Sequence, residues 1–146
     1  MRIIESHNAG KSQSPILNEV ILMELQTQEV ANVLVMHVTG RVDHTTAKQC
    51  ESLLLPHLEG CTGEVKKALI DLSGVDYMSS AGVRVLMLAL RQCQKQQGEL
   101  VLAELSPMLQ EVFKIMRLNS VFRVVATVRD GLAQLSPAAA AMYGRA

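Results

Sequence analysis

The sequence predicts an α/β fold in which a mixed sheet of four to five strands starts with an antiparallel hairpin and continues with parallel strands. Three observations support this prediction. Two stretches rich in β-forming residues lie near the start, with only two residues between them. Short, continuously apolar segments, typical of buried strands, then alternate with helical patterns. Each strand–helix–strand unit requires a parallel crossover, so the later strands are expected to run parallel to one another.

The antiparallel hairpin is predicted over Val20–Val30 and Val33–Thr39, two stretches rich in β-forming residues. Only Ala31-Asn32 separates them, which matches the two-residue connection of a tight hairpin. Gly40 and Asp43 follow and indicate a loop after the second strand.

A first helix is predicted over residues 46–59, where apolar side chains recur at helical spacing and Thr45 or Thr46 can cap the first turn. Pro56 lies inside this pattern, so we expect it to kink or shorten the helix. The next segment, Ala68–Leu72, is short and continuously apolar, which is typical of a buried central strand.

The same signals predict the rest of the fold. A turn at Ser73–Asp76 leads into a helix that starts at Ser80 and ends before Gly98. A second buried strand follows at Leu100–Ala103, and a helix that opens with a cap and a proline starts at Ser106-Pro107. The last strand is predicted at Phe122–Ala126 and a short helix at Arg129–Leu135. The tail, residues 137–146, fits either a frayed helix or a disordered segment.

Composition limits the classes of function. The 146 residues carry 14 Lys or Arg and 14 Asp or Glu, and aromatic residues make up 3% of the chain. A chain without net charge and with so few aromatic side chains gives no sign of a nucleic-acid partner. No apolar run reaches the roughly 18–20 residues of a membrane span, and no secretory signal is visible. We therefore expect a cytoplasmic protein that does not insert into a membrane.

No cofactor or metal is predicted. The three cysteines, Cys50, Cys61 and Cys93, are widely spaced without a CxxC pair, and we interpret them as reduced thiols in the core. Nucleotide-binding glycine motifs and HExxH-type metal motifs do not occur in the sequence.

The serine pair Ser79-Ser80 is the candidate functional motif, because it places two hydroxyls where a helix begins. The first turn of a helix has unpaired N–H donors and a partial positive charge, so a hydroxyl caps it and an added phosphate is stabilised there. The pair is therefore either an ordinary helix cap or a phosphorylation site.

A serine hydrolase is the enzymatic alternative. The segment around the serine pair holds only the second half of a G-x-S-x-G elbow, since Met78 stands in the place of the first glycine. His44 is the one histidine in a loop that could face Ser80, and Asp43 could orient it. The chain lacks a Gly-rich oxyanion loop, so the sequence favours His44 as a solvated loop residue and a protein that is not an enzyme.

Three segments resemble one known family. They are Ile70–Ser73 with Tyr77–Val83, then Thr39–Ala47, and then Gly98–Leu102 with Ser106-Pro107, Val112-Phe113 and Leu118. Together they cover about residues 20–136 and are similar to the motifs of STAS domains, specifically those of bacterial anti-sigma factor antagonists. On this resemblance we divide the chain into an N-terminal arm (1–18), a STAS domain (19–136) and a C-terminal tail (137–146).

The resemblance implies a fold with helices mainly on one face of the sheet, and a protein-binding switch. The phosphoacceptor of the family lies two residues before the glycine of its motif, which here is Ser80. The dephosphorylated form binds a protein that is both anti-sigma factor and serine kinase and so frees the sigma factor. Phosphorylation ends this binding, and a PP2C-type serine phosphatase restores it.

This chain departs from the family at Ser79, where many phosphorylated members carry Asp. The departure leaves three alternatives open: phosphorylation at Ser80, phosphorylation at Ser79, or none. An unphosphorylated STAS scaffold, or a regulatory subunit of a membrane transport complex, is the alternative function.

The predicted docking surface surrounds the acceptor, because Ser80 must reach a kinase active site. It is formed by the loop Arg41–Thr46, the turn Asp76–Ser80 and the exposed early face of the following helix. Six of its residues are the named partner-binding candidates: Asp43, His44, Thr45, Ser79, Ser80 and Arg84.

Overall fold

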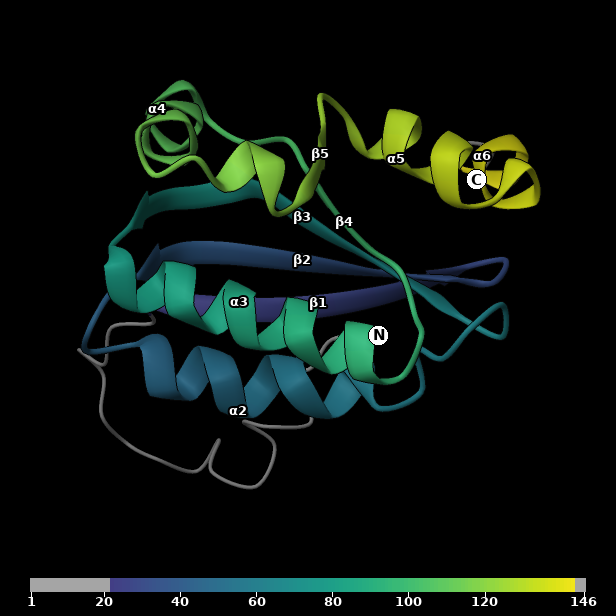
Figure 1. The fold of residues 1–146 in the computed structure, drawn as a ribbon, viewed down its shortest axis with the longest axis horizontal. Helices are drawn as coiled ribbons and strands as arrows, with labels where there is room; N and C mark the ends of the chain where they lie inside the picture. Colours follow the sequence, from purple (N-terminus) through teal and green to yellow (C-terminus); the bar gives the residue numbers. More distant parts are fainter. Residues whose placement is uncertain (1–21, 144–146) are drawn as a thin grey trace, which may run out of the picture.

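A five-stranded sheet in the order β1-β2-β3-β4-β5 forms the centre of the fold (Figure 1). The computed structural model describes residues 22–143. The predicted N-terminal arm, and Val20 and Ile21 of the predicted hairpin, lie outside the described residues.

The predicted hairpin is confirmed. Strands β1 (Met23–Val30) and β2 (Val33–Val42) pair antiparallel, with Val30 opposite Val33 across the two-residue turn. Ala31 adopts a left-handed conformation in this turn (φ 52°), which the tight connection requires.

Strand β2 is longer than predicted, because the loop expected at Gly40 is part of the strand. Gly40 has a φ of 99°, and the pairing register with β3 shifts next to it. A Cβ atom at this position would collide with the carbonyl oxygen of Leu22, where β1 begins. The glycine therefore allows a bulge and a close approach inside the sheet rather than ending the strand. As a result, Asp43 follows the last strand residue directly.

Strand β3 (Lys67–Met78) also continues past the predicted turn at Ser73–Asp76, which was wrong. It lies between β2 and β4 (Leu100–Ala103) and runs parallel to both. The last strand, β5 (Arg123–Val125), pairs parallel with β4. The mixed sheet predicted from the crossovers is thus present, with the longer β3 ending directly before the serine pair.

Three helices cover one face of the sheet, namely α2 (Ala47–Leu58), α3 (Ser80–Lys95) and α4 (Pro107–Ile115). Pro56 lies in the last turn of α2, which ends two residues later. Helices α2 and α3 lie side by side (Figure 1), and the amide of Gln96 donates to the carbonyl oxygen of Leu58 at 2.8 Å. The short 3₁₀ helix η1 (Leu118–Ser120) connects α4 to β5.

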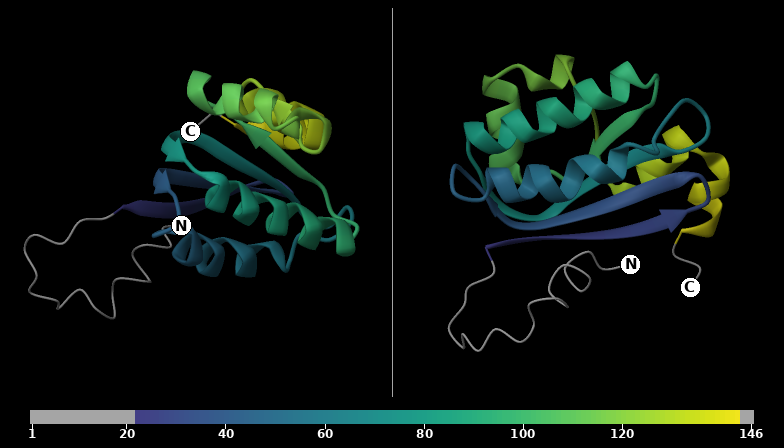
Figure 2. Two further views of the ribbon diagram at one scale, coloured as in Figure 1. Left: turned by 60° about the vertical axis from the view of Figure 1, so that its left-hand side comes forward. Right: turned by 90° about the horizontal axis from the view of Figure 1, so that it is seen from below.

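The other face is covered in part by α5 (Val128–Leu135) and α6 (Pro137–Met142) (Figure 2). The tail, for which helix and disorder were both open, therefore forms a helix over Pro137–Met142. Ala139 of this helix is buried in the second apolar core, together with Leu132 and Leu135. With three helices on one face and two on the other, the helices lie mainly on one face, as the resemblance implied.

Candidate functional site

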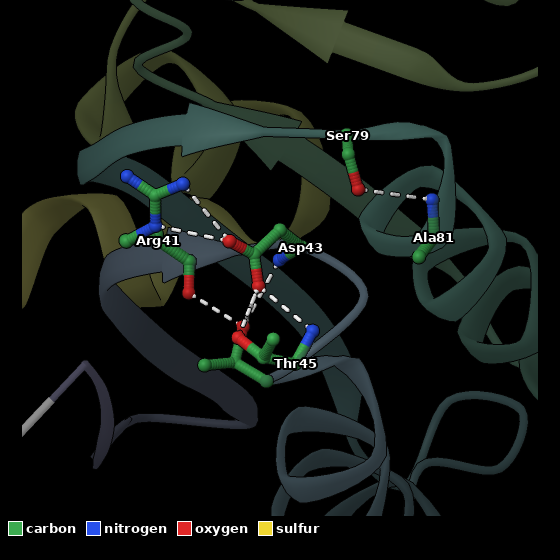
Figure 3. Close-up of polar contacts among 6 residues, drawn as sticks. Arg41, Asp43, Thr45, Ser79 and Ala81 are labelled. Carbon is green, nitrogen blue, oxygen red and sulfur yellow. Dashed lines mark hydrogen bonds and ion pairs between the residues drawn. The ribbon is translucent and has the colours of Figure 1, made fainter.

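The first turn of α3 lies directly against the end of β2. The backbone N–H of Ser79 donates to the carbonyl oxygen of Val42 at 3.0 Å. A Cβ atom at Gly82 would lie 2.7 Å from the same oxygen and 2.6 Å from Cγ of Met78, so only glycine fits this approach. Since β2 and β3 are parallel neighbours, this contact brings the serine pair to the same end of the sheet as Asp43 (Figure 3).

Asp43 is the most strongly bonded residue of this site (Figure 3). The residue is 6% exposed. Its carboxylate accepts the backbone N–H of Thr45 at 2.9 Å and the Thr45 hydroxyl at 2.6 Å. Nε and Nη2 of Arg41 each lie 3.0 Å from its other oxygen. The hydrogen bonds from Thr45 and then the Arg41 guanidinium hold the pKa of Asp43 well below its ordinary range. The carboxylate is therefore ionised at neutral pH.

Thr46 stabilises the same loop through hydrogen bonds to its backbone. Its hydroxyl accepts the N–H of Asp43 at 3.0 Å and donates to the carbonyl oxygen of Arg41 at 2.8 Å. Thr46 stands at the N-cap position of α2, but its side chain makes no capping hydrogen bond to the helix, so the capping role predicted for Thr45 or Thr46 is not found. The hydroxyls hold the loop that carries Asp43 instead.

Arg41 and Tyr77 lie in the two predicted docking segments, and they form a stacked pair that the sequence did not predict. They are opposite each other in the β2–β3 register, and the Arg41 guanidinium carbon lies 5.0 Å from the centre of the Tyr77 ring. The spacing could have indicated part of this arrangement, because residues two apart in an extended segment, such as Arg41 and Asp43, project to the same side. That signal was hidden by the expectation that Gly40 ended the strand.

The two serines occupy different positions. Ser79 is the N-cap of α3 and half-buried, and its Oγ accepts the N–H of Ala81 at 3.2 Å. Ser80 is the first residue of the helix and is exposed. Among residues 22–143, no hydrogen bond of the Ser80 side chain is found, so its hydroxyl projects from the helix start without a partner in this part of the chain.

Two further predicted docking residues, His44 and Arg84, are exposed. Arg84 lies one turn after Ser80 on α3 and therefore on the same side of the helix. His44 lies in the loop between Asp43 and α2. Within the described part of the chain, neither His44 nor Arg84 forms an ion pair. The structure thus places five predicted docking residues on two adjoining segments, with Arg84 one helical turn away.

The geometry of a serine triad is not found here. The oxygens of Asp43 are engaged by Thr45 and Arg41, and no hydrogen bond joins them to His44 in the region from Leu22 to Tyr143. Instead, a histidine–carboxylate pair occurs elsewhere on the sheet, where Nδ1 of His37 lies 2.7 Å from Asp71.

That pair lies on the second sheet face, because His37 and Asp71 each follow by two residues a strand residue of the second apolar core, Val35 and Leu69. Nε2 of His37 lies 3.2 Å from the side-chain oxygen of Gln28, and Asp71 also accepts the N–H of Ser73 at 2.9 Å. Burial alone would raise the pKa of Asp71, but the hydrogen bonds from His37 and Ser73 outweigh it and lower the pKa. Both ring nitrogens of His37 are engaged by neighbours on β1 and β3, and no serine side chain among residues 22–143 hydrogen-bonds to this histidine.

The remaining sequence expectations concern metals, membranes and thiols. No group of three metal-ligating side chains is found between residues 22 and 143. No helix in the same range combines the length and the apolar character that a bilayer crossing demands. The three cysteines are free and buried, and burial raises the thiol pKa of Cys50 and Cys93 to about 12 and that of Cys61 to about 11. The predicted core thiols are confirmed.

Comparison with known proteins agrees with the fold. One curated relative is BtrV of Bordetella bronchiseptica, which is named as a candidate anti-sigma factor antagonist. It is 38% identical over 102 residues, which cover 70% of this chain and 85% of BtrV.

Solved structures with the same fold include an anti-sigma factor antagonist (STAS) domain protein from Planctomyces limnophilus. Its TM-score is 0.69 at 24% identity, and the match covers 76% of this chain and 97% of that one. Another is the Bacillus cell fate determinant SpoIIAA in its phosphorylated form. Its TM-score is 0.57 at 20% identity, and the match covers 77% of this chain and 99% of that one. At these identities the two structures show a shared fold. The STAS domain family matches residues 24–131, which includes all the strands from β2 to β5 and the whole candidate site. The chain therefore belongs to the STAS domain family.

Proposed function

We propose that this protein is an anti-sigma factor antagonist that binds an anti-sigma factor with serine kinase activity and loses that binding when Ser80 is phosphorylated. The observation that carries the proposal is the exposed hydroxyl of Ser80, which stands at the start of α3 beside the rigid loop of Asp43. The similarity to BtrV supports the same class of activity. A PP2C-type phosphatase would restore the binding form, and the cytoplasm is the compartment that the proposal requires.

The position of Ser80 favours it over Ser79 as the acceptor. A kinase must reach the hydroxyl oxygen and align it with the transferred phosphoryl group. The Ser79 oxygen belongs to a half-buried residue and already accepts the N–H of Ala81, so it is less accessible to a kinase than the exposed Ser80. Ser80 can be phosphorylated without the loss of a hydrogen bond among the described residues.

The proposed switch acts through charge at the docking surface. A phosphate adds about −1.5 to −2 charge, which the N-terminus of α3 stabilises locally, so the domain itself keeps its fold. The same end of the sheet already carries the ionised carboxylate of Asp43. A partner that docks on both groups would have to desolvate a phosphate dianion where a small hydroxyl had been, next to a carboxylate that was already there. Such a change costs several kcal/mol, or a few decades of affinity.

Arg84 and Arg41 are the basic groups of this docking surface, and both are exposed at its margins. Exposed charges of this kind act mainly on association rate and on the choice of partner. Ion pairing with Asp43 restricts Arg41, whereas Arg84 has no ion-pair partner among residues 22–143 and can meet an acidic partner residue. The proposal therefore assigns partner contact to Arg84 and support of the loop to Arg41.

A pull-down followed by addition of ATP tests the proposal. The full chain is immobilised as the wild type, Ser80→Ala and Ser80→Asp, and is incubated with lysate of the organism that encodes it. We expect the wild type to retain an ATP-binding serine kinase that Mg-ATP releases. Ser80→Ala should retain the kinase after ATP is added, and Ser80→Asp should capture little of it.

The contrary result is equally specific. In that result, all three proteins capture the same partners, ATP releases none of them, and the partners are transporter subunits or other STAS proteins. The protein would then be a scaffold or a transport regulator, and the phosphorylation switch would be excluded.

A further inference from the structure

A groove of about 510 Å³ lies between α4 and β5, and the proposed function does not use it. Helix α4 and strand β5 lie on the side of the sheet away from β1 (Figure 1). Leu105, which follows β4, and Ala126, which follows β5, both line the groove. Its volume is in the range of ordinary binding pockets, which is about 300–1,000 Å³.

Hydrogen bonds between side chains and backbone hold the walls of this groove. Nε2 of Gln110 on α4 donates to the carbonyl oxygen of Leu105 at 2.8 Å, which ties the helix to the loop after β4. In that loop, Oε2 of Glu104 accepts the N–H of Val128 at 2.9 Å, just beyond the end of β5. Contacts within the protein thus fix the walls, which lowers the cost of ordering them around a ligand.

Two opposite charges line the groove from α4. Glu111 and Lys114 are three positions apart on the helix, and both are exposed. Side chains at this spacing are neighbours on a helix surface and can form an ion pair. Among residues 22–143, however, neither side chain forms an ion pair or a hydrogen bond. The groove therefore presents a carboxylate and an ammonium group that are close together but not paired.

The rest of the lining is apolar on the strand side. Val124 and Val125 of β5 contribute aliphatic side chains, and Leu105 adds a third. Asn119 of η1 adds an amide, whose side chain makes no hydrogen bond within the described part of the chain. A ligand that matches this lining carries both charges on one small group and has an apolar part beside them.

We propose that the groove binds a small zwitterion with an apolar side chain, of which a free apolar α-amino acid is the simplest. Its ammonium group pairs with Glu111, and its carboxylate pairs with Lys114 and accepts from the amide of Asn119. Its side chain lies against Leu105 and Val124. Because both protein charges are exposed, each ion pair contributes little, and we expect a dissociation constant on the order of 1 mM.

Other classes of ligand fit the lining less well. A phosphate group would find one cation among the lining residues, Lys114, and would be repelled by Glu111. A nucleobase binds by stacking on exposed aromatic rings. The aromatic residues of this region, Phe113 and Phe122, are buried and pack against each other with ring centres 5.7 Å apart.

This site is separate from the proposed switch. Strand β4 lies between β5 and β3, and Ser80 follows the end of β3. The inference therefore stands or falls independently of phosphorylation at Ser80.

Amide NMR titration of the isotope-labelled full chain tests the inference, with leucine as the probe. Three matched compounds each lack one group: leucinamide lacks the carboxylate, N-acetyl-leucine lacks the ammonium group, and glycine lacks the side chain. Leucine should shift the signals of α4 and β5 and reach saturation. Leucinamide and N-acetyl-leucine should bind about twofold to fivefold more weakly, and glycine about tenfold more weakly.

Two variants assign the charges. Glu111→Gln should weaken leucine binding about twofold to fivefold and leave N-acetyl-leucine unaffected, because that compound has no ammonium group. Lys114→Met should weaken leucine binding equally and leave leucinamide unaffected. The matched controls are Glu59→Gln and Lys48→Met, two exposed charges at and near α2, which should change none of these affinities.

A third variant tests the groove itself. Ala126 is exposed and lines the groove, so Ala126→Tyr should fill the space without changing a charge and abolish the saturable shifts. Thermal melts show whether each variant is folded, and the series of compounds on the wild type tests the inference even if one is not. Shifts that do not saturate, or equal affinities for leucine, leucinamide and glycine, would overturn the inference. Tighter binding of inorganic phosphate than of leucine would overturn it in favour of an anion site.

Discussion

The Oγ of Ser79 accepts the backbone N–H of Ala81 at 3.2 Å, so Ser79 caps α3 and leaves the neighbouring Ser80 hydroxyl exposed. The structure thus separates two roles that the sequence left joined in one pair of serines. One hydroxyl stabilises the helix, and the other is available to a partner.

Ser79→Ala should lower the free energy of unfolding by about 1 kcal/mol, because the first turn of α3 loses its side-chain cap. Ser80→Ala is the matched control and should change it by less than about 0.5 kcal/mol, since the side chain is exposed. Urea denaturation measures both. A larger loss in Ser80→Ala than in Ser79→Ala would show that the capping assignment is wrong.

Gly82→Ala should destabilise the protein by about 1–3 kcal/mol, although alanine is the better helix former. The added Cβ would lie 2.7 Å from the carbonyl oxygen of Val42 and 2.6 Å from Cγ of Met78, so α3 would have to move away from the end of β2. Gly60→Ala is the control, because a Cβ there meets nothing within 4 Å. Thermal melts compare the two variants, and similar melting temperatures would contradict the close seating of α3.

The contribution of Asp43 to stability should depend on pH in the acid range. Its pKa in the folded protein lies below the ordinary value of 3.8, so the ionised carboxylate stabilises the native state above that pH. The stabilisation is lost as the pH falls below 3.8 through the lower folded-state pKa. The difference in unfolding free energy between wild type and Asp43→Asn should therefore be constant near neutral pH and shrink below about pH 4.

Urea titrations at a series of pH values measure this difference. Asp71 titrates in both proteins, so its contribution cancels in the comparison. Thr45→Val, which removes a donor but keeps the carboxylate, should weaken the same pH dependence. A difference that stays constant down to the lowest pH would refute the role of the ionised carboxylate.

Arg84→Glu should slow association with the partner about threefold to tenfold and leave the melting temperature unchanged, because Arg84 is exposed on the same side of α3 as Ser80. Arg91→Glu reverses a charge farther along α3, away from Ser80, and should have a smaller effect. Stopped-flow association at low and high salt measures both. Equal rates for the two variants at low salt would remove Arg84 from the docking surface.

The sequence was sufficient for the order of the strands and of helices α2 to α5, but not for the length of the two strands that lead to the candidate site. Gly40 and the Ser73–Asp76 segment carry residues that favour turns, and local signals of this kind predict loops. In the structure, pairing between β2 and β3 continues through both segments, with register shifts next to Gly40. Tertiary pairing therefore outweighed the local preference.

Contacts that depend on strand register could not be predicted. The pairs Arg41–Tyr77 and His37–Asp71 join residues that are more than thirty positions apart and meet only because β2 and β3 pair in one particular register. The apolar pattern of a single sequence excludes a slip by one residue, but it does not tell which residues of β2 and β3 stand opposite each other. The short-range arrangement around Asp43 was accessible in part, because Thr45 and Thr46 follow it within three residues.

The central claim is that Ser80 accepts phosphate from a kinase that the protein binds, and intact-protein mass spectrometry tests it most directly. The wild type, Ser79→Ala and Ser80→Ala are each incubated with the captured kinase and Mg-ATP. The account predicts the added mass of one phosphate on the wild type and on Ser79→Ala, and none on Ser80→Ala. Phosphate on Ser80→Ala together with its loss from Ser79→Ala, or unmodified protein in all three reactions with an active kinase, would contradict it.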